Sequence, residues 1–138
     1  MKTAVLIIVT FGLATASAAD ADKLQGNWIA VSAERDGKPA ADIKGHMLTI
    51  DGDRFTIKLK DKVLYRGTIK VDEAKSPATI DFLHATDSLQ NKSWHGIFEL
   101  AGNTLKICDN GADLNKKRPT AFRTEADSGH VLVTFKRE

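Results

Sequence analysis

The side chains of this sequence that could carry out acid–base or metal chemistry are four histidines and a scatter of carboxylates. His46, His84, His95 and His130 lie in different segments, and no pair has the helical or hairpin spacing that would bring ligands together around a metal ion. The sequence also lacks the Gly-x-Ser-x-Gly, His-Glu-x-x-His and Cys-x-x-Cys motifs of hydrolases, metalloproteases and redox proteins. We therefore expect no catalytic activity, no metal site and no cofactor.

Most aspartates stand at the ends of predicted strands. At such a position an aspartate caps a turn through hydrogen bonds to its own backbone. The aspartates interpreted in this way are Asp51, Asp53, Asp61, Asp72 and Asp109.

Asp81 and Glu99 differ, because each lies inside a predicted strand among apolar neighbours. If the residues flanking Asp81 face inward, Asp81 itself faces solvent. Burying an unpaired carboxylate costs several kcal/mol, so an inward Glu99 would need a partner, and we expect it to face outward. An enzyme would require one of the two to point inward beside a histidine such as His84 or His95.

The elements that must position these side chains are β-strands. From Leu24 onward apolar and polar residues alternate between closely spaced turn signals, which is typical of an all-β domain. In RFTIKLK, for example, Phe55, Ile57 and Leu59 face one way and the polar residues the other. Residues 38–46 could hold a single helical turn, and 109–129 form a longer irregular segment. The eight predicted strands are 27–35, 46–50, 54–60, 63–71, 78–85, 93–100, 104–108 and 130–138.

Eight antiparallel strands in one domain, residues 19–138, most simply close into an up-and-down β-barrel, because closure removes exposed strand edges. A β-sandwich is the alternative, since both folds need the same alternation. Several predicted interior residues are large, so we expect a filled lower half and any cavity near an open mouth. The predicted interior residues are Ile29, Val31, Leu48, Ile50, Phe55, Ile57, Tyr65, Ile69, Ile80, Phe82, Phe98, Leu105, Ile107, Val131, Val133 and Phe135.

Residues 1–18 have the features of a secretory signal peptide. Lys2 supplies the positive charge, residues 3–15 the apolar stretch, and residues 16–18 the small side chains before cleavage between Ala18 and Ala19. The apolar run is too short to span a membrane, and no second run follows. We expect an exported protein, periplasmic or secreted, without an integral membrane segment.

The charges are nearly balanced and interspersed, with 20 lysines and arginines against 18 acidic residues. Nucleic-acid binding needs a basic patch that releases counterions, and binding to a membrane surface needs a polybasic segment, so we expect neither partner. Cys108 is the single cysteine, which excludes an intrachain disulfide. We expect it to be a buried, small apolar residue in a monomer; an intermolecular bridge or a reactive thiol is the alternative.

A short motif near the start of the first predicted strand carries a resemblance. Gly26-Asn27-Trp28 is similar to the Gly-x-Trp signature of lipocalins, in which the tryptophan lies across the closed end of the barrel and packs against an arginine from the last part of the chain. The resemblance implies a plug formed by Gly26, Trp28 and Arg137, with Arg123 as the alternative arginine. An indole and a guanidinium would seal the barrel through a broad cation–π contact.

Segments along nearly all of residues 24–138 resemble, in order and spacing, a lipocalin-like domain family common in Planctomycetes and some other bacteria. The resemblance implies a lipocalin-like barrel in an exported protein, and the family brings no established reaction or ligand. The chain lacks the second lipocalin signature, Thr-Asp followed by Tyr, and is shorter than most lipocalins, which leaves room for a small cavity or none. The similar segments are LQGNWIAVSAERDGKP, LTIDGDRFTIK, GTIKVD, IDF, GIFELAGNTLKIC, RPTAF and SGHVLVTFKRE.

The leading hypothesis is that the protein binds or carries a small apolar or amphipathic molecule. Tyr65 would be a polar handle at the mouth, and Trp94 could lie on a loop, as a lid or as an anchor for a protein partner. The alternative is a non-catalytic interaction module of the cell envelope, such as an inhibitor, with a packed barrel whose loops bind another protein. The candidate ligand-binding residues are Phe55, Ile57, Tyr65, Phe82, Trp94, Phe98 and Phe135.

Overall fold

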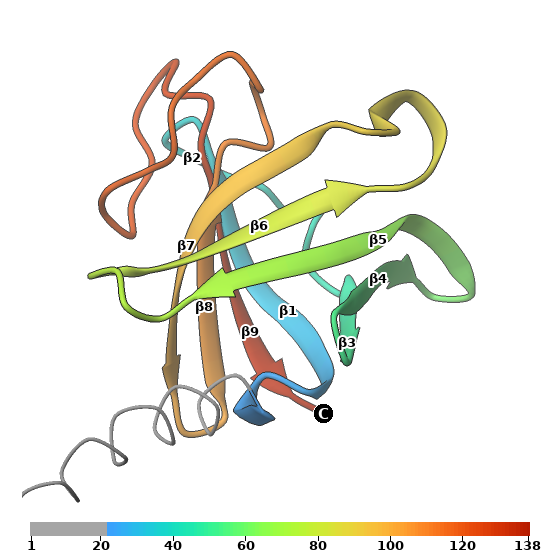
Figure 1. Ribbon diagram of the computed structural model, residues 1–138. Coiled ribbons are helices and arrows are strands. Elements are labelled where there is room, and N and C mark those ends of the chain that lie inside the picture. Colours follow the sequence, from blue (N-terminus) through green and yellow to red (C-terminus); the bar gives the residue numbers. More distant parts are fainter. Residues whose placement is uncertain (1–21) are drawn as a thin grey trace, which may run out of the picture.

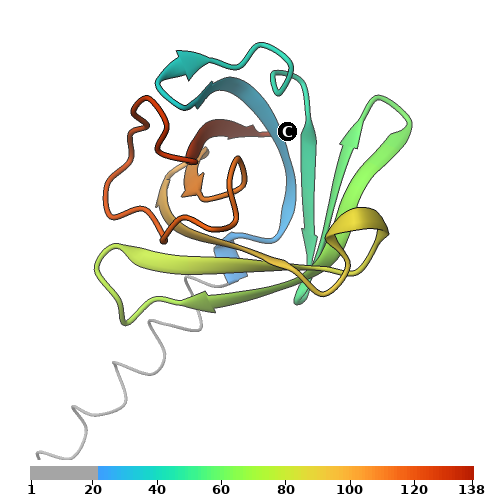
Figure 2. The ribbon, with the colours of Figure 1, turned by 90° about the horizontal axis from the view of Figure 1, so that it is seen from above.

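The alternating segments form a closed, lipocalin-like β-barrel in the computed structural model, which describes residues 22–138 (Figure 1). Each strand of the barrel pairs antiparallel with its neighbours, and the first and last strands also pair, so the ring closes (Figure 2). The predicted all-β barrel is therefore confirmed over the alternative sandwich. The predicted signal peptide and its cleavage site lie outside the described residues.

All eight predicted strands are present, with small shifts at their ends, and there is one additional short strand, β2 (Lys38–Pro39), which pairs with the end of β1. A two-residue strand leaves no alternation to detect in a sequence. The rest of residues 38–46 forms hydrogen-bonded turns in place of the expected helical turn. The eight barrel strands are β1 (Gly26–Arg35), β3 (Met47–Asp51), β4 (Arg54–Leu59), β5 (Lys62–Asp72), β6 (Ala78–His84), β7 (Ser93–Ala101), β8 (Thr104–Asp109) and β9 (Val131–Arg137).

The barrel interior is built from the predicted apolar faces, with one correction in β1. There Trp28 and Ala30 point inward and are buried, whereas Val31 is 38% exposed and Ile29 is half-buried on the outside. The inward Trp28 turns Ile29 outward, because neighbouring residues on a strand face opposite sides. A register shift between Ala30 and Ser32 then leaves Val31 as the extra residue of a bulge.

The other predicted interior residues are buried or pack against the core as expected. Tyr65 and Ile69 are the two that are only partly buried. The buried ones are Leu48, Ile50, Phe55, Ile57, Ile80, Phe82, Phe98, Leu105, Ile107, Val131, Val133 and Phe135.

One end of the barrel is closed by a tryptophan, an arginine and the turn that precedes β1. Trp28 is completely buried, and its Nε1 donates to the carbonyl of Leu24 at 2.9 Å. The guanidinium of Arg137 lies 4.1 Å from the centre of the Trp28 ring. It also donates to the carbonyls of Gln25 (2.8 Å) and Lys23 (2.7 Å). The last residue of β9 therefore fixes the start of the described chain across the floor of the barrel.

The geometry selects between the two arginines considered for this plug. Arg123 is exposed and pairs with Glu125 at 3.2 Å, so Arg137 is the residue over Trp28. Gly26 has a positive φ of 118°, and a Cβ there would lie 3.2 Å from Nη1 of Arg137. A side chain at this position would therefore crowd the plug.

The opposite end is the mouth, where the long segment 110–129 folds beside β7 and β8 (Figure 1, orange to red). Arg118 Nη1 donates to the Gly96 carbonyl at 2.8 Å, and the Cys108 thiol contacts the Arg123 carbonyl at 3.7 Å. Ile97 and Cys108 are consequently buried although they face away from the barrel interior. The predicted burial of Cys108 is confirmed, and burial raises the pKa of its thiol to about 12.

We expect Trp28→Ala to lower the free energy of unfolding by about 3–5 kcal/mol, as for other buried aromatic residues. Arg137→Ala should cost less, and the double variant should cost less than the sum, because the two side chains share one contact. Urea denaturation measures all three, with Arg123→Ala as the exposed control. Strictly additive losses would contradict a shared plug.

We expect the thiol of Cys108 to resist iodoacetamide in the native protein, because it is buried and its thiolate form is suppressed. Complete modification should follow in denaturant. Mass spectrometry of the two samples checks this, and rapid modification of the native protein would show that segment 110–129 does not cover Cys108.

Candidate functional site

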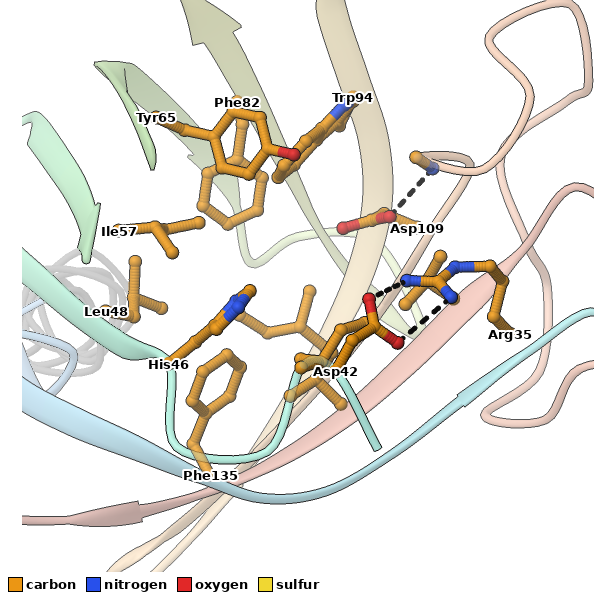
Figure 3. Close-up of a pocket in the computed structure, with 15 residues that line it drawn as sticks. Arg35, Asp42, His46, Leu48, Ile57, Tyr65, Phe82, Trp94, Asp109 and Phe135 are labelled. Carbon is orange, nitrogen blue, oxygen red and sulfur yellow. Dashed lines mark hydrogen bonds and ion pairs between the residues drawn. The ribbon is translucent and has the colours of Figure 1, made fainter. Parts of the chain in front are cut away.

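A cavity of about 150 Å³ opens at the mouth of the barrel (Figure 3). Its wall is mainly apolar and aromatic, and a few polar groups converge on it. The residues that line it are Arg35, Asp42, Ile43, His46, Leu48, Ile57, Tyr65, Phe82, Trp94, Ile107, Asp109, Gly111, Val131, Val133 and Phe135.

Five of the seven candidate ligand-binding residues line this cavity, namely Ile57, Tyr65, Phe82, Trp94 and Phe135. The other two lie elsewhere. Phe55 is deeper in the core, with its ring 5.0 Å from that of Phe82 in an edge-on contact. Phe98 faces a separate hollow beside Arg137 at the closed end, because β7 runs from the mouth at Ser93 to the floor at Ala101.

Trp94 lies within β7 and not on a loop, which corrects the expectation of a lid. It shares the inward face with Gly96 and Phe98, as strand alternation requires. The centre of its ring lies 4.9 Å from the ring centre of Tyr65 and 4.2 Å from the ring centre of His84. Trp94 is therefore part of the cavity wall.

His84 belongs to the same cluster of aromatic rings. The predicted interior residues did not include it. It is 1% exposed, and neither ring nitrogen has a hydrogen-bond partner among the described residues. Burial lowers its pKa to about 4, so the imidazole is neutral at physiological pH. His84 stands two residues after Phe82 and four residues after Ile80, which both face inward. This spacing is the sequence signal that predicts an inward His84.

Asp109 is the buried carboxyl of the cavity. It follows Leu105 and Ile107 on the inward face of β8 and is 8% exposed. Its Oδ1 accepts a hydrogen bond from the Gly111 amide at 2.8 Å, so it caps a turn as predicted. No other hydrogen bond to this carboxyl is found in the described part of the chain. Burial raises its pKa to about 7, although the bond from Gly111 acts in the opposite direction.

Two glycines allow the Asp109 carboxyl to lie against the ring cluster. Gly96 is its partner on β7, and a Cβ there would come within 2.9 Å of the Asp109 Cβ. A Cβ on Gly111 would lie 2.8 Å from Asp109 Oδ1 and 3.5 Å from the Trp94 ring. Side chains at these positions would displace the carboxyl or the indole.

An ion pair stands at the rim of the cavity. The Arg35 guanidinium donates to both carboxylate oxygens of Asp42, at 3.2 and 2.9 Å. These hydrogen bonds lower the pKa of Asp42 and raise that of Arg35. The segment that carries Asp42 is held to β1 by backbone bonds of 2.9 Å, including Gly45 N to the Ala30 carbonyl. Arg35 is thus already paired with the Asp42 carboxylate, whose segment is held in place.

The two carboxylates that raised the question of catalysis face outward, as predicted. Glu99 is exposed, and Asp81 Oδ1 contacts His95 Nδ1 at 2.9 Å and Arg118 Nη1 at 2.8 Å. Burial alone would raise the pKa of Asp81, but the two hydrogen bonds outweigh it and lower that pKa. Asp81 therefore helps to fix segment 110–129 through Arg118.

Residues 22–138 contain no cluster of three or more histidine, cysteine or acidic side chains that could hold a metal ion. In the same residues no helix is long and apolar enough to cross a bilayer.

We expect Asp109→Asn to stabilise the fold by about 1–4 kcal/mol at pH 8. The pKa of Asp109 is raised in the native state, so the ionised carboxylate is penalised above pH 7 and the penalty fades as the pH falls toward 4. The amide keeps the acceptor for Gly111 but carries no charge. Urea denaturation at several pH values measures the difference, with Glu99→Gln as the exposed control. An equal gain at pH 4 and pH 8 would contradict a buried carboxyl.

Comparison of the chain with protein-family models, with curated proteins and with solved structures finds no match.

Proposed function

We propose that this protein binds a small apolar or amphipathic molecule in the cavity at the mouth of the barrel, without catalysing a reaction. The observation that carries the proposal is the cavity itself, an apolar and aromatic hollow at the open end with a few convergent polar groups. This combination is typical of small-molecule sites in β-barrels. The polar groups are Arg35, Asp42, His46, Tyr65 and Asp109.

The volume limits the ligand. Sites for drug-sized molecules usually measure about 300–1,000 Å³, whereas a cavity of about 150 Å³ takes a molecule such as benzene. The packed core around Phe55 prevents deeper entry. The ligand is therefore one small ring or short chain, or the end of a longer molecule whose remainder lies outside the mouth.

Asp109 supports the same proposal from its energetics. A buried carboxyl with one hydrogen bond lowers stability when it ionises, and such groups concentrate at functional sites. A core that served folding alone would favour an apolar residue after Leu105 and Ile107. The carboxyl is better explained as the polar contact for a ligand.

The sequence supports the setting of this function. The resemblance to lipocalin-like domains and the predicted signal peptide favour an exported binder or carrier, in the periplasm or outside the cell, that acts as a monomer.

A protein-binding module is the second candidate. Three apolar side chains on β4, β5 and β6 are more than one third exposed, namely Leu59, Val63 and Leu83. Exposed apolar groups of this kind can contribute to a protein interface. This function would leave the cavity empty.

Filling the cavity distinguishes the two. Val133 lines the cavity from β9, and Val31 is an exposed valine on β1, so Val133→Phe and Val31→Phe add the same atoms inside and outside. Native mass spectrometry of protein purified gently from its host should show a small adduct on the wild type and V31F that is lost under denaturing conditions. The adduct should be absent from V133F, whose folding is checked by circular dichroism.

An adduct retained by folded V133F would show that the ligand binds elsewhere. A clean mass for the wild type, unchanged after incubation with host lipid extract, would favour the protein-binding module.

A further inference from the structure

We propose that the mouth cavity selects a small organic ammonium ion, a primary or secondary amine with one apolar group about the size of a benzene ring, and pairs it with the Asp109 carboxylate. This inference rests on the proposed function and names its ligand class.

The free polar atoms of the lining residues include one carboxylate oxygen, which is an acceptor, and the indole N–H of Trp94, a buried donor without a partner in the described part of the chain. Asp109 Oδ1 is held by the Gly111 amide, and Oδ2 has no hydrogen bond within the described part of the chain. The one guanidinium on the wall, that of Arg35, faces both oxygens of Asp42. An anionic ligand would gain a cationic partner only by breaking this pair and would lie near the Asp109 carboxylate, whereas an ammonium finds an unpaired carboxylate.

An aromatic wall completes the site for a cation. The rings of Tyr65, Phe82 and Trp94 lie along one side of the cavity, next to Asp109 (Figure 3). Aromatic rings attract ammonium groups, most strongly where water is excluded, and provide apolar area for the attached group. The Tyr65 hydroxyl can accept a second N–H.

The surrounding charges leave the site one unit negative when Asp109 is ionised. Its strand partners, Gly96 and Val131, carry no charge. The Arg35 and Asp42 charges cancel, and burial lowers the pKa of both histidines of the site. One ammonium therefore neutralises the cavity. The titratable groups around the cavity and its ring cluster are Arg35, Asp42, His46, Tyr65 and His84.

Ammonium binding should depend on pH. Because burial places the pKa of Asp109 at about 7, the empty site is protonated below pH 7 and must release that proton to bind a cation. Affinity for an ammonium should therefore fall about tenfold from pH 8 to pH 6. Binding of a neutral molecule should not fall with pH.

Three probes of similar shape test the inference by isothermal titration calorimetry, namely benzylamine, benzyl alcohol and benzoate. At pH 8 the wild type should bind benzylamine at least tenfold more tightly than benzyl alcohol, and benzoate not at all. Asp109→Asn should bind benzylamine no better than benzyl alcohol. Glu99→Gln removes an outward carboxylate and should behave as the wild type. The pH dependence of the wild type tests the same point without a substitution.

The outcomes separate the two proposals. Equal binding of benzylamine and benzyl alcohol, a preference for benzoate, or an unchanged amine preference in D109N overturns the ammonium inference and leaves the mouth as a binding site. Failure of all three probes to bind the wild type at pH 8 also overturns the ammonium inference, and it overturns the proposed function when the native mass of the wild type is clean as well.

Discussion

The contact between Trp28 and Arg137 determines much of what the rest of the barrel can do. The two residues stand opposite each other where β1 pairs with β9, so the contact seals the floor at the seam that closes the ring. The inward Trp28 also fixes which residues of β1 face the core, because alternation permits one choice. Arg137 extends the seal by hydrogen bonding the carbonyls of the preceding turn.

A sealed floor makes the two ends of the barrel unlike. Below the level of Phe55 the interior is filled by apolar side chains, while above it the wall changes to Tyr65, Trp94 and Asp109. Segment 110–129 is tied to the outer face through Arg118, which leaves the mouth open. The fold thus concentrates its stability at one end and its unsatisfied polar groups at the other, a division expected where binding competes with packing.

Most of the barrel could be predicted from the sequence, because period-two alternation is a strong signal in eight successive segments. The prediction failed in β1, where the bulge at Val31 breaks the alternation, and at β2, which is too short to alternate. The plug could be predicted because Gly26-Asn27-Trp28 is a recognisable motif. Nothing local indicated which arginine lies over Trp28, since that depends on where the last strand ends.

The site was partly predictable for the same reasons. Ile57, Tyr65, Phe82 and Phe135 follow from alternation, and extending the pattern to the last residue of two strands would have found His84 and Asp109. An aspartate at a strand end is interpreted as a turn cap, and Asp109 does cap a turn. That interpretation does not include the inward position of its carboxyl. The cavity and the Arg35–Asp42 pair arise from packing between distant segments, which no local pattern encodes.

The account depends most directly on the state of one carboxyl group. A ¹³C NMR titration of the Asp109 carboxyl carbon, assigned by comparison with Asp109→Asn, measures its pKa in the folded protein. We predict a value of about 7, and a lower value when the cavity holds an ammonium. A pKa near that of a solvated aspartate, about 3.9, in the empty protein would show that the carboxyl is not buried at the mouth and would contradict the account.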